Sequence, residues 1–209
     1  MRLVMLSDTH TMHNQINVPD GDVLIHAGDL TYTGKRSQWV SALEWLSGLP
    51  HKHKIYIAGN HDFASDHFCR SVENIYYLNN SGVTIEGHTF WGSPITPTFG
   101  RWAHMCDPEI IGEYWDMIPA NTEVLITHGP PWGMLDESGL PYNRGHLGCE
   151  TLHDAVFERV RPKIHVFGHI HGGYGHKERS DGESGPEFYN ASVVNEAYKV
   201  VNKPWVVDL

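Results

Sequence analysis

The chain contains a series of short apolar runs, each followed within a few residues by side chains able to bind a metal ion. The segments after these runs are Asp8-Thr9-His10, Gly28-Asp29, Gly59-Asn60-His61-Asp62, Thr127-His128-Gly129 and Gly168-His169-Ile170-His171. Short apolar runs bounded by turn residues are typical of buried strands. In open α/β folds, ligands bind beyond the carboxyl ends of the strands. The pattern therefore predicts a sheet protein with a polar site at its strand ends.

Strand-like and helical patterns alternate along the chain. Runs rich in Val, Ile and aromatic residues predict strands at 2–6, 22–27, 54–58, 75–78, 83–85, 89–92, 123–127, 163–167, 187–190 and 205–207. Helices are expected at 37–49, 108–117 and 149–160, with Ser37 and Asp107 as N-caps of the first two. The alternation predicts an α/β fold with helices packed over sheets, partly antiparallel because 83–92 and 187–207 resemble hairpins. A length of 209 residues fits a single domain, 1–209.

Composition narrows the classes of function. The formal charge of −10 argues against capture of duplex nucleic acid, which requires a basic surface. Anionic substrates are compatible with this charge, because bound divalent ions invert the local potential. The three cysteines are widely spaced without a CxxC motif, and no signal peptide or apolar run of membrane length is evident. We therefore expect a cytoplasmic protein that does not bind membranes.

The polar segments supply the ligand types of a hydrolytic two-metal site. Asp8 and His10 are one residue apart, so a loop leaving a strand can turn both toward one ion. A glycine precedes Asp29 and lets the backbone come close, which suits a carboxylate that bridges two ions about 3.5–4 Å apart. Taken singly, Asn60 has an alternative interpretation as an Asx-turn and His128 as a turn histidine. Their joint occurrence after strand-like runs favours the metal site.

These segments resemble the calcineurin-like metallophosphoesterase superfamily. The resemblance is strongest to its metallophosphoesterase-domain-containing subgroup, which includes animal brain proteins that hydrolyse cyclic nucleotides. Further matching segments are His26-Ala27-Gly28-Asp29, Gly92-Ser93-Pro94, Thr127-His128-Gly129-Pro130-Pro131, 161–168 and Asn190-Ala191-Ser192. The match covers nearly the whole chain. It implies a four-layer α-β-β-α sandwich of two mixed sheets flanked by helices, with metals at the sheet edge.

The resemblance also implies two ligand sets that share one carboxylate. The first ion would take Asp8, His10, Asp29 and His171, and the second Asp29, Asn60, His128 and His169. Some animal members of the subgroup have glycine in place of His169, which weakens their second site, so we expect the more active two-metal form here. Manganese is the expected metal, with iron, zinc and nickel as alternatives. His26, Cys149 and His165 also match the subgroup and are expected in the core or behind the ligands.

The implied reaction is hydrolysis of small phosphodiesters, with 2′,3′- or 3′,5′-cyclic nucleotides as expected substrates, by attack of a metal-bridging hydroxide. His61 is expected to donate to the leaving oxygen or to stabilise the transition state, with Asp62 orienting it and holding it protonated. A purely capping role for this pair is the alternative. Candidate substrate contacts are Arg101, Trp102, Trp132 and Arg144. The tryptophans either stack on a base or only pack the loops.

Other functions are compatible with the same resemblance. One is a phosphomonoesterase, phosphoprotein phosphatase or nuclease of the superfamily. Phosphoprotein phosphatases typically carry Gly-Asn-His-Glu, where this chain has Asp62, and a processive nuclease would need further domains or a basic surface. A non-catalytic protein-binding scaffold is disfavoured because no ligand position is vacant. The pattern does not predict an oligomeric state.

Overall fold

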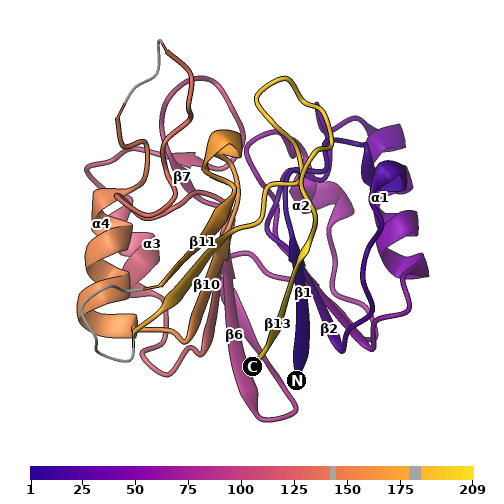
Figure 1. The fold of residues 1–209 in the computed structure, drawn as a ribbon, viewed down its shortest axis with the longest axis horizontal. Coiled ribbons are helices and arrows are strands. Elements are labelled where there is room, and N and C mark those ends of the chain that lie inside the picture. Colours follow the sequence, from indigo (N-terminus) through magenta and orange to yellow (C-terminus); the bar gives the residue numbers. More distant parts are fainter. Residues whose placement is uncertain (142–144, 179–184) are drawn as a thin grey trace.

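Two β-sheets lie face to face in the middle of the molecule, and helices cover their outer faces (Figure 1). The structure is a computed structural model that describes residues 1–141, 145–178 and 185–209. The layers run from helix through both sheets to helix, so the predicted four-layer α/β sandwich with mixed sheets is confirmed.

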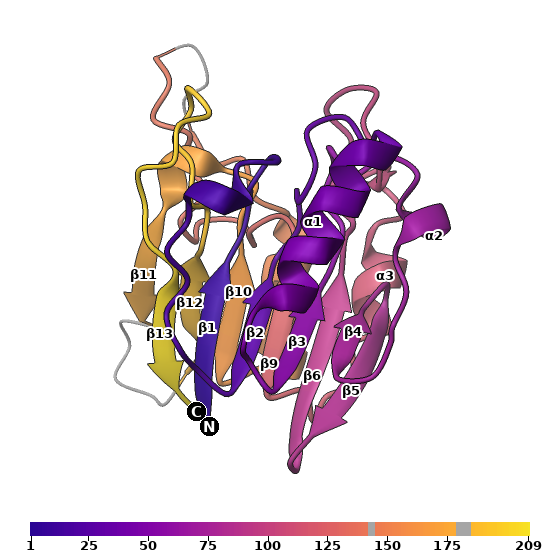
Figure 2. The same ribbon diagram turned by 90° about the vertical axis from the view of Figure 1, so that its right-hand side faces the viewer.

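The first sheet has the strand order β13-β1-β2-β3-β4. Its parallel strands are β1 (Arg2–Leu6), β2 (Val23–His26), β3 (His53–Tyr56) and β4 (Ile75–Tyr77). The last strand of the chain, β13 (Trp205–Asp208), pairs antiparallel with β1. Both termini therefore lie together at the lower end of the molecule (Figure 2).

The second sheet has the strand order β11-β12-β10-β9-β6-β5. Its parallel strands are β6 (His88–Ser93), β9 (Val124–Thr127), β10 (Ile164–Phe167) and β12 (Glu187–Asn190). Antiparallel strands flank them at each edge, β5 (Ser81–Ile85) and β11 (Gly175–Glu178). A separate short parallel pair joins β7 (Thr96–Pro97) to β8 (Met105–Cys106).

The helices divide between the two outer faces. α1 (Arg36–Gly48) and the short α2 (Ser65–Phe68) lie on the side of the first sheet, and α3 (Gly112–Asp116) and α4 (Glu150–Asp154) on that of the second. α4 continues as a π-helical segment, Ala155–Val160. Short 3₁₀ turns cover His13–Gln15 and His171–Gly173. Among the described residues, none of the helices is long and apolar enough to cross a membrane.

Strand β1 shows how the sequence builds the layers. Successive side chains of a strand point to opposite faces of the sheet. Leu3 and Met5 lie in the core between the two sheets, whereas Val4 and Leu6 pack on the other face in the cluster that contains Trp39 of α1. All four strand residues are fully buried. A strand buried on both faces reads as a continuous apolar run, which is why it was recognisable in the sequence.

Three local expectations were wrong. The N-cap of α1 is Lys35, so the helix begins one residue before Ser37. Asp107 precedes a turn, since its carbonyl oxygen accepts from the backbone of Ile110 and Ile111, and α3 begins only at Gly112. Finally, residues 187–207 do not form a hairpin. β12 and β13 lie in different sheets because β13 crosses over to pair with β1.

Candidate metal centre

The candidate ligands follow the carboxyl ends of parallel strands in both sheets. Asp8 comes after β1, Asp29 after β2 and Asn60 after β3, all in the first sheet. His128 directly follows β9, and His169 comes two residues after β10, both in the second sheet. Packing of the two sheets face to face brings these strand ends together, so residues far apart in sequence surround one location.

The backbone around the ligands adopts a conformation that non-glycine residues rarely use. The φ angles are 59° at Asp8, 41° at His10, 57° at Asp29 and 66° at His169. Left-handed backbone at a non-glycine residue costs free energy and concentrates at functional sites, where the surrounding structure imposes it. Hydrogen bonds impose it here, because the backbone N–H of Asp8 donates to Gly28 at 3.0 Å and that of His10 to Asp29 at 3.0 Å.

Glycine is required where the backbone approaches the ligands most closely. Gly28 has a φ of 100°, and a Cβ atom there would lie 2.5 Å from Nδ1 of His128. A Cβ atom on Gly168 would lie 2.1 Å from a carboxylate oxygen of Asp8. Real Cβ atoms essentially never come this close to another heavy atom, so any side chain at these positions would displace a ligand.

The first group of converging side chains is Asp8, His10 and His171, all buried. Oδ1 of Asp8 lies 3.6 Å from Nε2 of His171 and 4.0 Å from Nε2 of His10. The two histidine Nε2 atoms are 3.4 Å apart. Two nitrogen lone pairs at this separation repel each other unless a proton or a cation lies between them, so the group is suited to hold a positive ion.

The second group contains Asp29, Asn60 and His128. Nε2 of His128 lies 3.4 Å from Oδ2 of Asp29 and 2.9 Å from the amide oxygen of Asn60. The same Oδ2 atom of Asp29 is 3.7 Å from Nε2 of His10 in the first group. One carboxylate oxygen thus lies within 4 Å of donors from both groups, which is the position required of a bridging ligand.

Hydrogen bonds to backbone carbonyls orient the histidine rings. Nδ1 of His128 lies 2.9 Å from the carbonyl oxygen of Ala27, and Nδ1 of His10 lies 3.3 Å from that of Thr31. A carbonyl oxygen only accepts, so each Nδ1 carries its proton and donates. In the neutral ring, Nε2 is the nitrogen that carries the lone pair, and it faces the carboxylates, as metal coordination requires.

Burial and mutual charge set the ionisation of the centre. Burial alone would raise the pKa of Asp8 and of Asp29, yet the neighbouring histidines hold the pKa of both carboxyl groups well below the usual range. Burial likewise opposes protonation of His128, but Asp29 and Asp8 raise its pKa to about 9. The carboxylates thus draw positive charge into a buried site, and a metal ion that binds there would displace these protons.

His169 contacts the centre through both its backbone and its ring. Its N–H lies 3.1 Å from a carboxylate oxygen of Asp8, and its ring centroid lies 5.0 Å from that of His128. The ring lines the cavity described below. Among the described histidine, cysteine and acidic side chains, three groups of three are close enough to hold an ion: Asp8, His10 and His171; His10, Asp29 and His61; and Asp8, Asp29 and His128. His169 belongs to none of these three groups.

The contacts of Asp62 differ from the expectation that it orients His61. The Asp62 carboxylate accepts from the backbone N–H of Leu30 at 3.1 Å, Thr31 at 2.8 Å and Gly59 at 2.9 Å, and from the Thr31 hydroxyl at 2.8 Å. It therefore fixes the loops that carry Asp29 and Asn60. Burial and the charge of Asp29 raise the pKa of Asp62 to about 7, against these four hydrogen bonds.

The side chain of His61 is held by residues other than Asp62. Nδ1 of His61 lies 2.9 Å from the carbonyl oxygen of Tyr32 and donates to it. Its backbone N–H donates to Oδ1 of Asp29 at 2.8 Å. Nε2 of His61 lies 3.4 Å from the hydroxyl of Tyr198. The backbone of residue 32, and not a neighbouring carboxylate, thus orients this ring.

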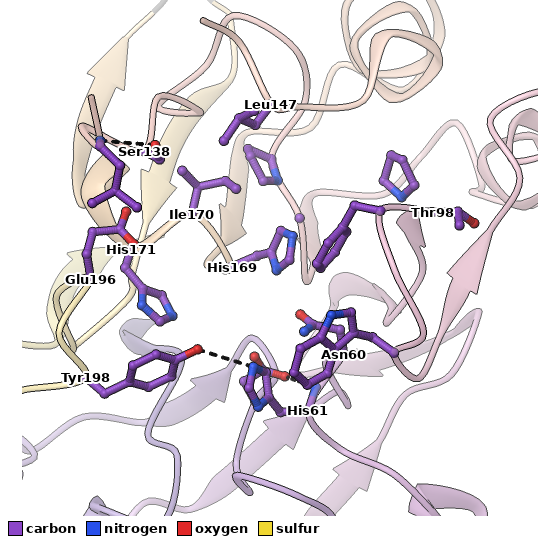
Figure 3. A pocket seen from close by; sticks show the side chains of 17 residues that line it. Asn60, His61, Thr98, Ser138, Leu147, His169, Ile170, His171, Glu196 and Tyr198 are labelled. Carbon is purple, nitrogen blue, oxygen red and sulfur yellow. Dashed lines mark hydrogen bonds between the residues drawn. The ribbon is translucent and has the colours of Figure 1, made fainter. Parts of the chain in front are cut away.

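A cavity of about 450 Å³ opens above the ligands (Figure 3). Asp29, Asn60, His169 and His171 line it next to apolar side chains that include Phe99, Trp102, Leu140 and Leu147. Glu196 and Tyr198 border it on the side of His171. An apolar wall beside a small set of polar groups is typical of a small-molecule site.

Of the four residues expected to contact the substrate, the structure describes three and places one of these in the cavity. Trp102 lines the cavity, with its ring centroid 4.5 Å from that of His61. Arg101 is exposed and does not line the cavity. Trp132 packs against His146 and His153 outside it. Arg144 lies outside the described residues.

Sequence reasoning missed Tyr198 and Glu196, which follow the last motif of the chain. Burial raises the pKa of Tyr198 to about 12. No periodicity or ligand spacing marks the Asn-Glu-Ala-Tyr sequence at 195–198, so only the fold reveals its place at the site.

His26 and His165 are fully buried, as expected. Their Nε2 atoms meet the hydroxyls of Thr9 and Thr127.

Comparisons with known proteins agree with this architecture. A model of the calcineurin-like phosphoesterase family matches residues 1–173. The chain is 39% identical to human metallophosphoesterase domain-containing protein 1 over its whole length, covering 71% of that protein. It is 38% identical to UPF0046 protein K07C11.7 of Caenorhabditis elegans, over 99% of this chain and 74% of the relative. With its two mixed sheets and its cluster of carboxylates and histidines at the strand ends, the chain belongs to the calcineurin-like phosphoesterase family.

Proposed function

We propose that this protein is a phosphodiesterase that uses two divalent metal ions to hydrolyse small phosphodiesters, with cyclic nucleotides as the substrate class. The observation that carries the proposal is the position of Asp29. Its Oδ2 atom lies 3.7 Å from Nε2 of His10 and 3.4 Å from Nε2 of His128, between the two groups of ligand side chains. A carboxylate so placed can join two ions into one centre.

The side chains present fit such a pair of ions. Asp8, His10 and His171, with Asp29, would hold the first. Asn60, His128 and His169, again with Asp29, would hold the second. Mixed imidazole, carboxylate and amide ligands suit manganese, iron, zinc or nickel, and manganese is the ion we propose. When bound, the two ions would supply Lewis acidity at the phosphoryl oxygens and lower the pKa of an attacking water.

His61 is the side chain best placed to act on the leaving group. Its Nδ1–H is held by the carbonyl of Tyr32, which directs Nε2 into the cavity. A phosphodiester bound at Asp29 and Asn60 would lie within reach of this nitrogen, because both residues line the same cavity as His61. Protonated Nε2 would donate to the oxygen that leaves phosphorus, while Asp62 holds the supporting loops through Leu30, Thr31 and Gly59.

The walls of the cavity support a nucleotide-sized diester. Phe99 and Trp102 offer aromatic faces above the centre, and base–aromatic stacking contributes about 1–3 kcal/mol per base. The carboxylate of Glu196 borders the same cavity. A negative side chain disfavours the dianion of a phosphomonoester more than the monoanion of a diester, by simple charge repulsion. The aromatic faces thus favour a nucleotide, and the charge of Glu196 favours its diester over its monoester.

The test is an assay of the purified protein with Mn²⁺ against 2′,3′- and 3′,5′-cyclic nucleotides, aryl phosphodiesters and phosphomonoesters. We expect hydrolysis of diesters, with monoesters much slower. No hydrolysis of any diester by protein shown to contain metal would overturn the proposal. In the same assay, His61→Ala should keep its metal while turnover falls by about 10²-fold or more. Unchanged turnover would remove His61 from the mechanism.

A further inference from the structure

Tyr198 reaches the centre from a segment that supplies none of the expected ligands. Its ring lies edge-on to two of them, with centroids 4.9 Å from His10 and 5.2 Å from His171. Its hydroxyl oxygen is 3.4 Å from Nε2 of His61, inside the cavity (Figure 3). The ring therefore packs against the centre while the hydroxyl faces the place where a substrate would bind.

The loop that carries Tyr198 is built to present it. The side-chain oxygen of Asn195 accepts from the backbone N–H of Ala197 at 3.0 Å and of Lys199 at 3.1 Å. The N–H of Tyr198 donates to the carbonyl oxygen of Asn195 at 2.8 Å. Glu196 accepts from the backbone N–H of Gly172 at 3.1 Å, which ties the loop to the segment of His171. These bonds leave the position of residue 198 little freedom.

Tyr198 also has a backbone conformation that costs free energy. Its φ is 54°, in the left-handed region that residues with bulky side chains rarely occupy. Asn, Asp and Gly adopt it more readily, yet here it holds a tyrosine. Strain of this kind persists where the surrounding structure imposes it, and it clusters at functional sites. In this loop the residue with the strained backbone is the one whose hydroxyl meets His61.

From this geometry we infer that Tyr198 is a catalytic residue whose hydroxyl donates a hydrogen bond to a phosphoryl oxygen of the reacting diester, beside His61. The inference rests on the proposed function. Nδ1 of His61 is engaged by Tyr32, so Nε2 is the nitrogen that meets the Tyr198 hydroxyl, and both residues line the cavity. A fixed donor aimed at developing charge on phosphoryl oxygen stabilises the transition state more than the bound substrate.

The substitution Tyr198→Phe tests the hydroxyl alone, because phenylalanine keeps the ring that packs on His10 and His171. In metal-loaded protein we expect kcat for a phosphodiester to fall by about 10- to 100-fold, with KM changed by less than about threefold. Orthovanadate, which mimics five-coordinate phosphorus, should inhibit the variant more weakly by a similar factor, whereas inhibition by inorganic phosphate should change little. Metal content should equal that of the wild type.

Tyr174→Phe is the matched control. It removes a tyrosine hydroxyl that donates to the carbonyl of Lys203 at 2.8 Å, away from the cavity, and should leave kcat unchanged. An unchanged kcat in Tyr198→Phe, a rise in KM alone, or a loss of bound metal would each overturn the inference while the proposed function stands. Failure of the wild type to hydrolyse any phosphodiester would overturn both.

Discussion

A methyl group added at Gly59 tests whether the centre depends on the observed position of Asp29. A Cβ atom there would lie 2.2 Å from Oδ1 of Asp29, 2.6 Å from its backbone nitrogen and 2.6 Å from Cε1 of His128. Ordinary contact begins near 3.4 Å, so the carboxylate would have to move by about 1.2 Å. The other two close atoms belong to the backbone of Asp29 and to the ring of His128, which shift less easily than a carboxylate. Overpacking of this kind costs about 1–3 kcal/mol.

The functional loss should exceed the loss of stability. Metal sites tolerate ligand displacements of only about 0.2 Å, and a misplacement of about 1 Å can cost 10²-fold in rate. Gly59→Ala should therefore lose at least one ion and more than about 10²-fold in diester hydrolysis, while urea unfolding of the metal-free protein shifts by only about 1–3 kcal/mol. These effects are measured by elemental analysis, steady-state kinetics and equilibrium unfolding.

Gly48→Ala provides the control, because Gly48 ends α1 and a Cβ atom there meets nothing within 4 Å. This variant should retain both ions and full activity. Two bound ions per chain and a wild-type rate of diester hydrolysis in Gly59→Ala would show that the centre does not depend on the position of Asp29, since a carboxylate displaced by about 1.2 Å could not bridge the ions.

Acid should unfold the protein partly through His165. Burial lowers the pKa of this ring to about 3, from 6.5 in the unfolded chain, and its buried Nδ1 has no hydrogen-bond partner among the described residues. The folded state binds fewer protons between these values, so the free energy of unfolding should fall as pH drops from 6.5 toward 3, by at most on the order of 5 kcal/mol. In His165→Gln this fall should be smaller, and an identical pH profile in denaturant titrations would contradict the assignment. Trp102→Ala should slow hydrolysis of cyclic nucleotides about 10-fold while sparing aryl phosphodiesters, because only nucleotides offer a base to stack. Equal losses on both substrates would argue for packing alone.

The strands were predictable because a strand that is buried on both faces consists of consecutive apolar residues. Val4 and Met5, for example, face different layers, and both must be apolar. The partners of the last strand were not predictable in this way. A short run such as β13 is compatible with several partners, and it pairs with β1 only because the chain crosses between the sheets.

At the site, the sequence predicted residues that lie within a few positions of strand ends, and it gave no sign of Tyr198 or Glu196, which a later loop brings to the cavity. His128 directly follows β9 and Asp29 lies three residues after β2, so their convergence follows from strand order. Asp62 was assigned to His61 because the two are neighbours in sequence, yet a carboxylate in a tight turn meets backbone N–H groups more readily than the next side chain. Tyr198 depends on a loop conformation with a φ of 54°, which no local pattern predicts.

If Asp29 joins two ions into one centre, the number of ions bound by defined variants should reveal it. After loading with Mn²⁺ and removal of free metal, the wild type should contain two ions per chain by elemental analysis. His171→Ala, which alters only the first ligand set, should retain one ion, whereas Asp29→Ala should retain neither at the same loading. A single ion in the wild type, or two ions in Asp29→Ala, would show that Asp29 does not bridge a pair of ions.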